Sequence, residues 1–202
     1  MDFSLTREQA LVQKMMQSFT ENEVKPIAAE IDRTHQYPTE NVAKLFKLGV
    51  MGMTVPKEYG GMGADQVAAA ICTEELAKAC ASTSDIVAGH TLCCVPIVEH
   101  GTEEQKKKYL PMLTKGGVLG GMGITEPNAG SDASKSQTEA RLEGDHYVIN
   151  GSKIFITNGP EAGVFVIFAM TDKTKGNKGL SAFIIESSFP GFSIGKVEDK
   201  MG

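Results

Sequence analysis

The chain has 202 residues, of which 41% are hydrophobic and 22% charged, a composition typical of a folded domain with a substantial core. The formal net charge of −5 argues against a nucleic-acid-binding protein, because such binding depends on neutralising many phosphates. No uninterrupted run of 18 apolar residues occurs and the first residues lack a basic-then-apolar pattern, so we expect neither a membrane span nor a signal peptide.

The four cysteines show neither C-x-x-C spacing nor nearby ligand pairs; they are Cys72, Cys80, Cys93 and Cys94. We interpret them as buried, reduced thiols of a protein from a reducing compartment. A metal site is the weaker alternative, and we assign no metal ligands.

The first half of the chain has helical periodicity. Thr6 to Gln9 has the form of a capping box, and a second one runs from Thr102 to Gln105, opening a helix toward residues 111–113. Between them we predict a helix from about Pro38 to Gly49 and two alanine- or apolar-rich helices over 64–80 and 85–100. After the first capping box, the apolar residues predict one buried stripe: Leu11, Val12, Met15, Met16 and Phe19.

The second half is rich in β-branched residues and turn signals. We predict strands over 147–150, 153–157, 164–170 and 180–186, with turns at 143–145, 150–151 and 174–179. The sequence therefore predicts a helical domain over residues 1–116 and a small β domain over residues 117–202.

A glycine-rich stretch runs from Met122 to Asp132. Small residues and a proline make a loop whose backbone can approach a ligand closely, and Thr125 and Ser131 add hydroxyl groups that can donate to phosphate or carbonyl oxygens. The stretch contains neither the G-x-G-x-x-G pattern of dinucleotide-binding folds nor a Walker loop. The alternative is a polar turn with no ligand.

A second stretch covers residues 151–159. On the predicted strand, alternation places Phe155 and Thr157 on one face, where they offer a ring and a hydroxyl to a flat ligand. The alternative makes Phe155 a core residue and Thr157 the end of a strand.

Together these stretches resemble the acyl-CoA dehydrogenase family. The resemblance covers the whole chain and is nearest to the short-chain, butyryl-CoA type of bacteria. It rests on four runs in family order: Val55–Gly61 (VPKEYGG), Gly101–Pro111 (GTEEQKKKYLP), Thr125–Asp132 (TEPNAGSD) and Gly151–Asn158 (GSKIFITN).

The resemblance implies an α+β fold, with an N-terminal all-α helical domain, a small β-barrel-like middle domain and a C-terminal four-helix domain that is missing here. It implies FAD as cofactor and a short-chain acyl-CoA as substrate, oxidised to the trans-2-enoyl-CoA or formed by the reverse reduction. It also implies electron exchange with an electron-transferring flavoprotein, a homo-oligomer (a homotetramer in the family) and a cytoplasmic location in a bacterium.

The resemblance also implies roles for single residues. Thr125 would hydrogen-bond the pyrimidine end of the flavin, Phe155 would pack on the ring, Thr157 would donate near flavin N5, and Ser131 would lie where cofactor phosphate and acyl-CoA meet. Met122 and Phe155 depart from the Tyr or Phe and the Trp that the family often has there. The implied cofactor-binding set is Met122, Gly123, Ile124, Thr125, Glu126, Pro127, Asn128, Ala129, Gly130, Ser131, Phe155, Ile156 and Thr157.

The family's catalytic glutamate lies in the C-terminal domain, where it removes the proton alpha to the thioester while the beta hydrogen leaves as hydride. We therefore expect the chain to stop before its catalytic base and assign no catalytic residue within 1–202. Two alternatives remain: a non-catalytic fragment that binds a ligand or partner, and a related acyl-CoA oxidase or flavin monooxygenase.

Overall fold

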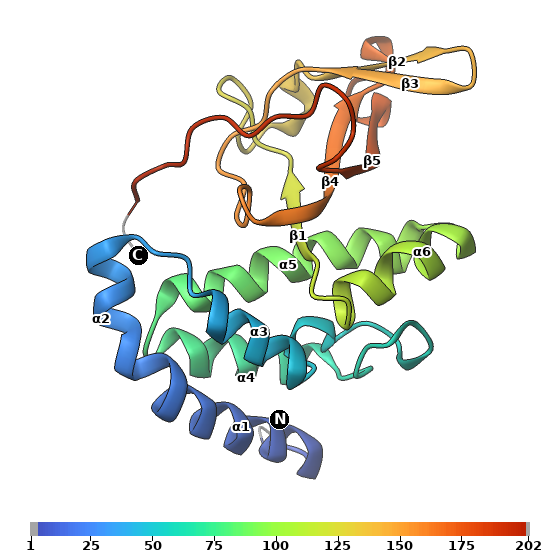
Figure 1. The fold of residues 1–202 in the computed structure, drawn as a ribbon. Helices are drawn as coiled ribbons and strands as arrows, with labels where there is room; N and C mark the ends of the chain where they lie inside the picture. Colours follow the sequence, from blue (N-terminus) through green and yellow to red (C-terminus); the bar gives the residue numbers. More distant parts are fainter. Residues whose placement is uncertain (1–3, 201–202) are drawn as a thin grey trace. The chain divides into compact units, whose positions relative to one another are not determined.

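The computed structural model describes residues 4–200, in which every α-helix precedes every strand (Figure 1). Contacts divide the chain into a helical unit, which runs to Val118 and includes the residues from Asp199, and a sheet unit, Leu119–Glu198. The predicted α+β class is confirmed. The described helices are α1 (Arg7–Phe19), α2 (Lys25–Thr34), α3 (Thr39–Lys47), α4 (Gln66–Ala77), α5 (Ala81–His100) and α6 (Glu103–Thr114), with a π-helical turn at Thr20–Val24.

Both predicted capping boxes are confirmed. The backbone N of Gln9 donates to Thr6 Oγ1 over 3.2 Å while the backbone N of Thr6 donates to Gln9 Oε1 over 2.9 Å. Thr102 and Gln105 form the same pair of bonds over 2.8 and 3.2 Å. The local hydrogen-bond chemistry of these segments is sufficient to start a helix.

The apolar stripe predicted for α1 is wrong at Leu11, whose side chain is 59% exposed, whereas Met16 and Phe19 are buried. The helix is attached to α4 in part by polar contacts. Gln13 and Gln17 donate to the buried carboxylate of Glu75 over 3.3 and 3.2 Å. Because the two amide groups on one helix face can attach the helix as well as apolar side chains do, hydrophobic spacing alone misplaced the buried face.

The helix α2 was not predicted. Only Ile31 in it is buried, so this helix contributes little to the core. Its proline, Pro26, lies in the first turn, where a missing N–H costs no hydrogen bond. The predicted helix over 38–49 is confirmed as α3, with Gly49 in the left-handed conformation (φ 78°) just beyond its end.

The longest helix, α5, lies at the centre of the helical unit and packs against both α4 and α6 (Figure 1). By length and composition it is the one described helix that could cross a membrane. Half of its apolar window is buried inside the unit, as in the core helix of a folded domain, so it is weak evidence for a span.

All four cysteines are buried and unbonded to one another, as predicted. Burial raises the pKa of the Cys72 thiol to about 12, which keeps it protonated and unreactive.

The sheet unit holds a five-stranded mixed sheet in the order β1-β4-β2-β3, with β5 also paired to β4. β1 runs parallel to β4, β5 runs antiparallel to β4, and β2 and β3 form a hairpin closed by Gly144 in the left-handed conformation. The strands are β1 (Leu119–Gly123), β2 (Glu139–Glu143), β3 (His146–Asn150), β4 (Ala162–Met170) and β5 (Leu180–Glu186).

The predicted strands over 147–150, 164–170 and 180–186 are confirmed as β3, β4 and β5. The strand predicted over 153–157 is wrong, because these residues form an irregular segment. β2 was not predicted, and neither was β1, which contains three glycines and has low intrinsic strand propensity.

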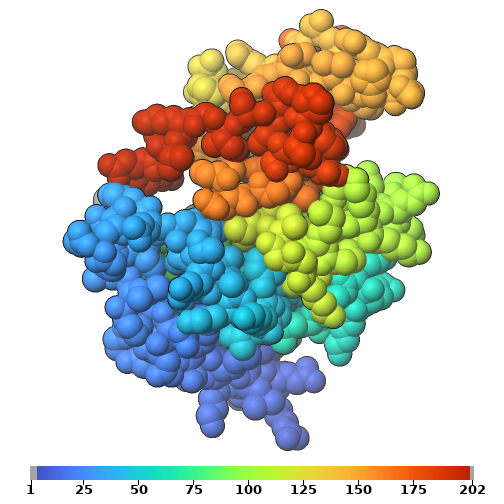
Figure 2. Space-filling view, viewed as in Figure 1, coloured from blue at the N-terminus to red at the C-terminus, as the bar shows by residue number. Residues whose placement is uncertain are grey.

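The chain after β5 folds back on the sheet unit. The ring of Phe192 lies 5.0 Å from the ring of Phe165, centroid to centroid, and in the space-filling view this segment (red) lies across the strands (Figure 2). Phe165 is 2% exposed and is the largest of the most deeply buried side chains. The core of the sheet unit is therefore centred on β4.

His90 in α5 gives a pH-dependent prediction for stability. Its ring is completely buried beside Phe46 and Cys94, and burial lowers its pKa from 6.5 to about 4. Between pH 6.5 and 4 the unfolded chain therefore binds a proton at this histidine, and the folded chain does not. The stability that comes from the neutral histidine is present above pH 6.5 and is lost as the pH falls toward 4. We expect the loss to be about 3 kcal/mol of unfolding free energy.

Urea unfolding at pH 7, 6, 5 and 4 measures this effect. Wild-type protein and His100→Gln, altered at an exposed histidine of the same helix, should show the same decline. His90→Leu should show a shallower one. An identical pH dependence for all three proteins would contradict the assignment.

Candidate functional site

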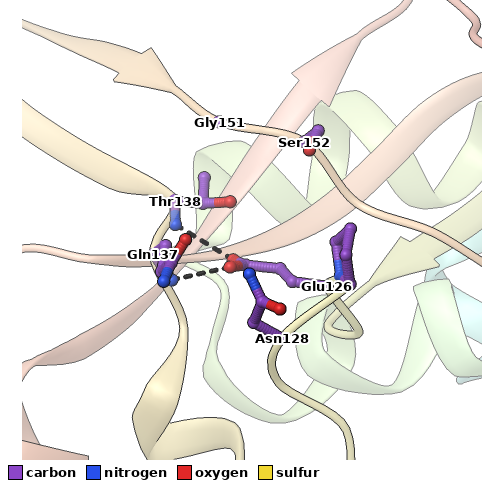
Figure 3. A pocket seen from close by; sticks show the side chains of 7 residues that line it. Glu126, Asn128, Gln137, Thr138, Gly151 and Ser152 are labelled. Carbon is purple, nitrogen blue, oxygen red and sulfur yellow. Dashed lines mark hydrogen bonds between the residues drawn. The ribbon is translucent and has the colours of Figure 1, made fainter.

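The two predicted site stretches meet in the sheet unit, around a pocket of about 360 Å³ (Figure 3). Residues from both stretches and from the segment before β2 form its wall: Glu126, Pro127, Asn128, Gln137, Thr138, Gly151 and Ser152. The wall is mostly polar, and the carboxylate of Glu126 points across it toward the backbone of Gln137 and Thr138 (Figure 3).

Glu126 is 5% exposed, and both of its carboxylate oxygens accept hydrogen bonds. The backbone N atoms of Gln137 and Thr138 donate over 2.6 and 3.0 Å, and the hydroxyl of Ser136 donates over 2.5 Å. These three bonds fix the glycine-rich loop to the segment that leads into β2.

Lys153 completes this network from the other stretch. Its ammonium group donates to Glu126 Oε1 over 2.7 Å, to the backbone O of Ile124 over 3.0 Å and to Ser136 Oγ over 3.1 Å. The two charged side chains are only 6% and 4% exposed. An ammonium group has three protons to donate, so this buried cation has its hydrogen-bonding capacity matched.

Burial by itself would raise the pKa of the Glu126 carboxyl, but the bonds from Lys153, Ser136, Thr138 and Gln137 hold it well below its usual range. The group therefore stays ionised at neutral pH, and both of its oxygens already accept hydrogen bonds from within the protein. This arrangement makes Glu126 a structural carboxylate and unsuited to act as a general base.

The backbone joins the two stretches as well. The N–H of Ile154 donates to the backbone O of Thr125 over 2.9 Å, and Glu126 and Ala129 exchange a reciprocal pair of backbone bonds that close the turn between them. Thr125 is thereby bonded to Ile154, the residue that precedes Phe155 in the chain. The Thr125 hydroxyl makes no hydrogen bond to any other described residue.

Phe155 has a left-handed backbone (φ 57°), which is unusual for a residue with a bulky side chain, and its ring is 59% exposed. The alternation argument that placed Phe155 and Thr157 on one strand face is therefore wrong, since the segment does not form a strand. The interpretation of Phe155 as a core residue is wrong too. Thr157 is half-buried.

Asn158 fixes the far end of this segment. It is also left-handed (φ 65°), and its Nδ2 donates to the backbone O of Gly120 in β1 over 3.1 Å. The N–H groups of Glu161 and Ala162 both donate to its backbone O, so Asn158 also leads the chain into β4. Asparagine tolerates this backbone region better than most residues.

The surroundings of three glycines in the two stretches show where a side chain would fit and where it would not. A Cβ on Gly123 would lie 2.5 Å from Cδ1 of Ile167 in β4, and one on Gly151 would lie 2.6 Å from the Cα of Thr138. Close packing therefore requires glycine at position 151, where the neighbour is backbone, whereas at position 123 the end of the Ile167 side chain would have to move. A Cβ on Gly130 would meet no atom within 4 Å, so the loop is open there.

The other residues predicted to bind the cofactor differ in how far they are exposed. Pro127, Asn128, Gly130 and Ser131 are exposed, and Ala129 is buried. Met122, Ile124 and Ile156 are half-buried.

The sequence analysis missed Lys153, Ser136, Thr138 and Asn158 as contributors to this site. The one signal that pointed to them was the lysine in the Gly-x-Lys run, a lone cation beside a run of apolar residues. The partners of Lys153 lie 17 to 29 residues away, beyond the reach of any local pattern.

Comparison with known families identifies both units. Residues 6–117 match the acyl-CoA dehydrogenase N-terminal domain, and residues 121–202 match the acyl-CoA dehydrogenase middle domain. The chain belongs to the acyl-CoA dehydrogenase family.

This acyl-CoA dehydrogenase chain is 62% identical over 203 residues to the short-chain specific acyl-CoA dehydrogenase of Clostridium acetobutylicum, covering 100% of this chain and 54% of the relative. The chain thus spans about half the length of the curated relatives it matches. The family consists of FAD-dependent oxidoreductases, and one solved relative, from Bacillus anthracis, is an acyl-CoA dehydrogenase complexed with FAD (37% identity, TM-score 0.89, 98% of this chain and 35% of that one).

Two other solved structures have nearly the same fold. Butyryl-CoA dehydrogenase from Megasphaera elsdenii has a TM-score of 0.95 and 45% identity, covering 100% of this acyl-CoA dehydrogenase chain and 54% of that one. A chain from work on the electron transferring flavoprotein of Acidaminococcus fermentans and flavin-based electron bifurcation has a TM-score of 0.96 and 47% identity, covering 100% and 53%.

We predict that Lys153→Met destabilises the protein by about 3–5 kcal/mol, because it leaves the Glu126 carboxylate buried without its counter-ion. Lys173→Met is the matched control: Lys173 is 65% exposed, pairs with Glu139 at the surface, and its loss should change stability by less than about 1 kcal/mol. Thermal unfolding of the two variants measures the difference. Equal shifts would show that burial of the Lys153 pair has no energetic consequence.

We also predict that Asn158→Ala costs about 2 kcal/mol, because alanine disfavours the left-handed backbone and leaves the Gly120 carbonyl without its donor. Asn158→Gly should cost less, since glycine accepts the backbone and loses only the side-chain bond. Urea unfolding of both variants separates the cost of the backbone conformation from the cost of the lost side-chain bond. A larger loss for glycine than for alanine would contradict the role given to the backbone conformation.

Proposed function

We propose that the protein containing this chain is an FAD-dependent dehydrogenase that oxidises a short-chain acyl-CoA, such as butyryl-CoA, to the trans-2-enoyl-CoA or catalyses the reverse reduction. The observation that carries the proposal is the joining of the glycine-rich loop and the 151–158 segment into one rigid surface by Lys153 and Glu126. Family membership supports placing flavin chemistry at that surface.

The residues present fit a flavin. The exposed ring of Phe155 offers an apolar surface for a flat ring system, and the Thr125 hydroxyl, which no described residue engages, is available to a polar edge. The loop at Gly130 is open, and Ser131 is exposed beside it, which allows a phosphate to approach the backbone closely.

Within this proposal each residue binds or orients. Thr125 hydrogen-bonds the pyrimidine end of the flavin, Phe155 packs on the ring, and Thr157 donates at the N5 edge. Ser131 contacts the cofactor phosphate and the acyl-CoA, and the backbone from Met122 to Ser131 lines the cofactor. Bound FAD supplies a two-electron acceptor for hydride. We assign no catalytic base among residues 1–202. The Glu126 carboxylate instead holds the glycine-rich loop in place through its hydrogen bonds.

The substrate class and electron partner follow the relatives. A short-chain specific enzyme and a butyryl-CoA dehydrogenase both match the full chain, which supports a short acyl group. The match to a chain studied with an electron transferring flavoprotein supports such a flavoprotein as electron partner. The bacterial relatives also support a cytoplasmic protein, and we propose a homo-oligomer as its functional form.

The anaerobic absorption spectrum of the protein, purified at the length that its own gene encodes, tests this proposal. Bound flavin should be yellow and should bleach on addition of butyryl-CoA, and intact mass should be recorded on the same sample. Flavin that binds but does not bleach would support a ligand-binding protein without turnover. Rapid reoxidation of bleached flavin by oxygen would support an oxidase.

We predict that Phe155→Ala weakens FAD binding about tenfold, because aromatic contact with a flat ring contributes on the order of 1–3 kcal/mol. Phe189→Ala, at another exposed phenylalanine of the sheet unit, is the control and should bind FAD like the wild type. Titration of the apoprotein with FAD, followed by flavin fluorescence, gives both dissociation constants. Equal constants would remove Phe155 from the proposed site.

A further inference from the structure

The ammonium group of Lys153 bridges two segments that no sheet hydrogen bonds join. Its backbone belongs to the 151–158 segment, whereas all three groups that its Nζ contacts belong to the 124–136 loop: the Ile124 carbonyl, the Glu126 carboxylate and the Ser136 hydroxyl. In the chain, Thr125 lies between two of these contacts, Ile124 and Glu126, and Phe155 follows Lys153 by two residues. The bridge therefore joins the two segments that carry the groups that the proposed function directs at one flavin ring.

Directional bonds are needed here because neither segment has a regular conformation. Residues 124–138 contain one short helical turn, Ala133–Lys135, and residues 151–158 contain no helix or strand. A backbone bond from Ile154 to Thr125 joins the segments beside the lysine. One bond of this kind leaves rotation open, whereas three additional bonds from one ammonium group fix both distance and orientation.

The burial of the pair distinguishes it from another ion pair of the sheet unit. Lys153 and Glu126 are 6% and 4% exposed, whereas Lys173 and Glu139, which also join distant segments of the sheet unit, are 65% and 25% exposed. Water has little access to the two buried side chains, so hydrogen bonds between them are stronger than at the surface. A buried ion pair is a poor source of stability compared with apolar packing, and a role in specifying one geometry is consistent with its presence.

We propose that Lys153 and Glu126 are positioning residues for the cofactor: they hold Thr125 and Phe155 in the register that lets both contact one flavin ring. Neither side chain touches the cofactor in this arrangement, so Glu126 acts through the loop and does not bind flavin directly. The inference rests on the proposed function, since it concerns the same flavin surface. It assigns Glu126 and Lys153 a role that the sequence motifs alone do not assign.

The test separates positioning from stability by removing both charges together. Lys153→Met leaves an unpaired buried carboxylate, whereas Lys153→Met combined with Glu126→Gln leaves no buried charge and should recover most of the lost thermal stability. Lys173→Met combined with Glu139→Gln makes the same chemical changes at the exposed pair and is the matched control. Each apoprotein, at the length its gene encodes, is titrated with FAD, and the visible spectrum and reduction potential of the bound flavin are recorded.

We expect the buried double variant to bind FAD about ten- to a hundredfold more weakly than the wild type, because small displacements of positioned groups have large effects. Its bound flavin should also show a shifted spectrum and potential even where its melting temperature is restored. The control double variant should match the wild type in all three quantities. Restored stability accompanied by wild-type affinity, spectrum and potential would overturn the proposal and leave the pair a purely structural feature.

Ser136→Ala keeps the inference testable if the buried double variant does not fold. This change removes one partner from Lys153 and one from Glu126 but retains both charges. A shifted flavin spectrum or weaker FAD affinity relative to the wild type supports positioning, and an unchanged spectrum and affinity count against it. Absence of FAD binding by the wild-type protein would instead overturn the proposed function itself, together with the inference built on it.

Discussion

The sheet unit depends on one buried ion pair, formed by Glu126 and Lys153. Removing two charges from water is costly, and here the cost is offset only because nearly every lone pair and proton of the two groups is engaged within the protein. Such a network tolerates few geometries. The two irregular segments that carry the family motifs are therefore held as firmly as if they belonged to a sheet.

Other contacts of the unit extend this frame. The side chain of Asn158 fixes the end of the second segment to β1, and the glycines of β1 allow β4 to approach closely enough for Phe165 and Ile167 to fill the space. An exposed aromatic ring with a strained backbone, that of Phe155, projects from a rigid base. Strained residues of this kind persist where their surroundings determine them, and they concentrate at functional sites.

The helical unit uses a different balance of forces. Its longest helix, α5, packs against α4 and α6 and carries a buried histidine whose neutral form is favoured by burial. Its first helix is attached to α4 partly through amide groups directed at a buried carboxylate, Glu75. Polar contacts thus replace apolar ones at the edge of the unit, whereas the centre is conventional hydrophobic packing.

The sequence by itself determined the features that arise from neighbouring residues. The capping boxes at Thr6 and Thr102, the left-handed glycine at 49 and the strands β3 to β5 all follow from interactions within a few positions of the chain, so local chemistry was enough to predict them. The family motifs likewise located the two site stretches, because each is a short contiguous run.

Only the tertiary structure decided how those two stretches contact each other. Residues 153–157 alternate like a strand, yet the left-handed Phe155 and the bonds of Lys153 to a loop more than 20 residues distant hold them in an irregular conformation. Glu126 lies in the motif predicted to bind the cofactor, and folding adds the contacts of its carboxylate with Lys153 and with the backbone N–H of Thr138. Periodicity and propensity describe a residue's neighbours along the chain, whereas the burial of a charge depends on groups that only folding brings together.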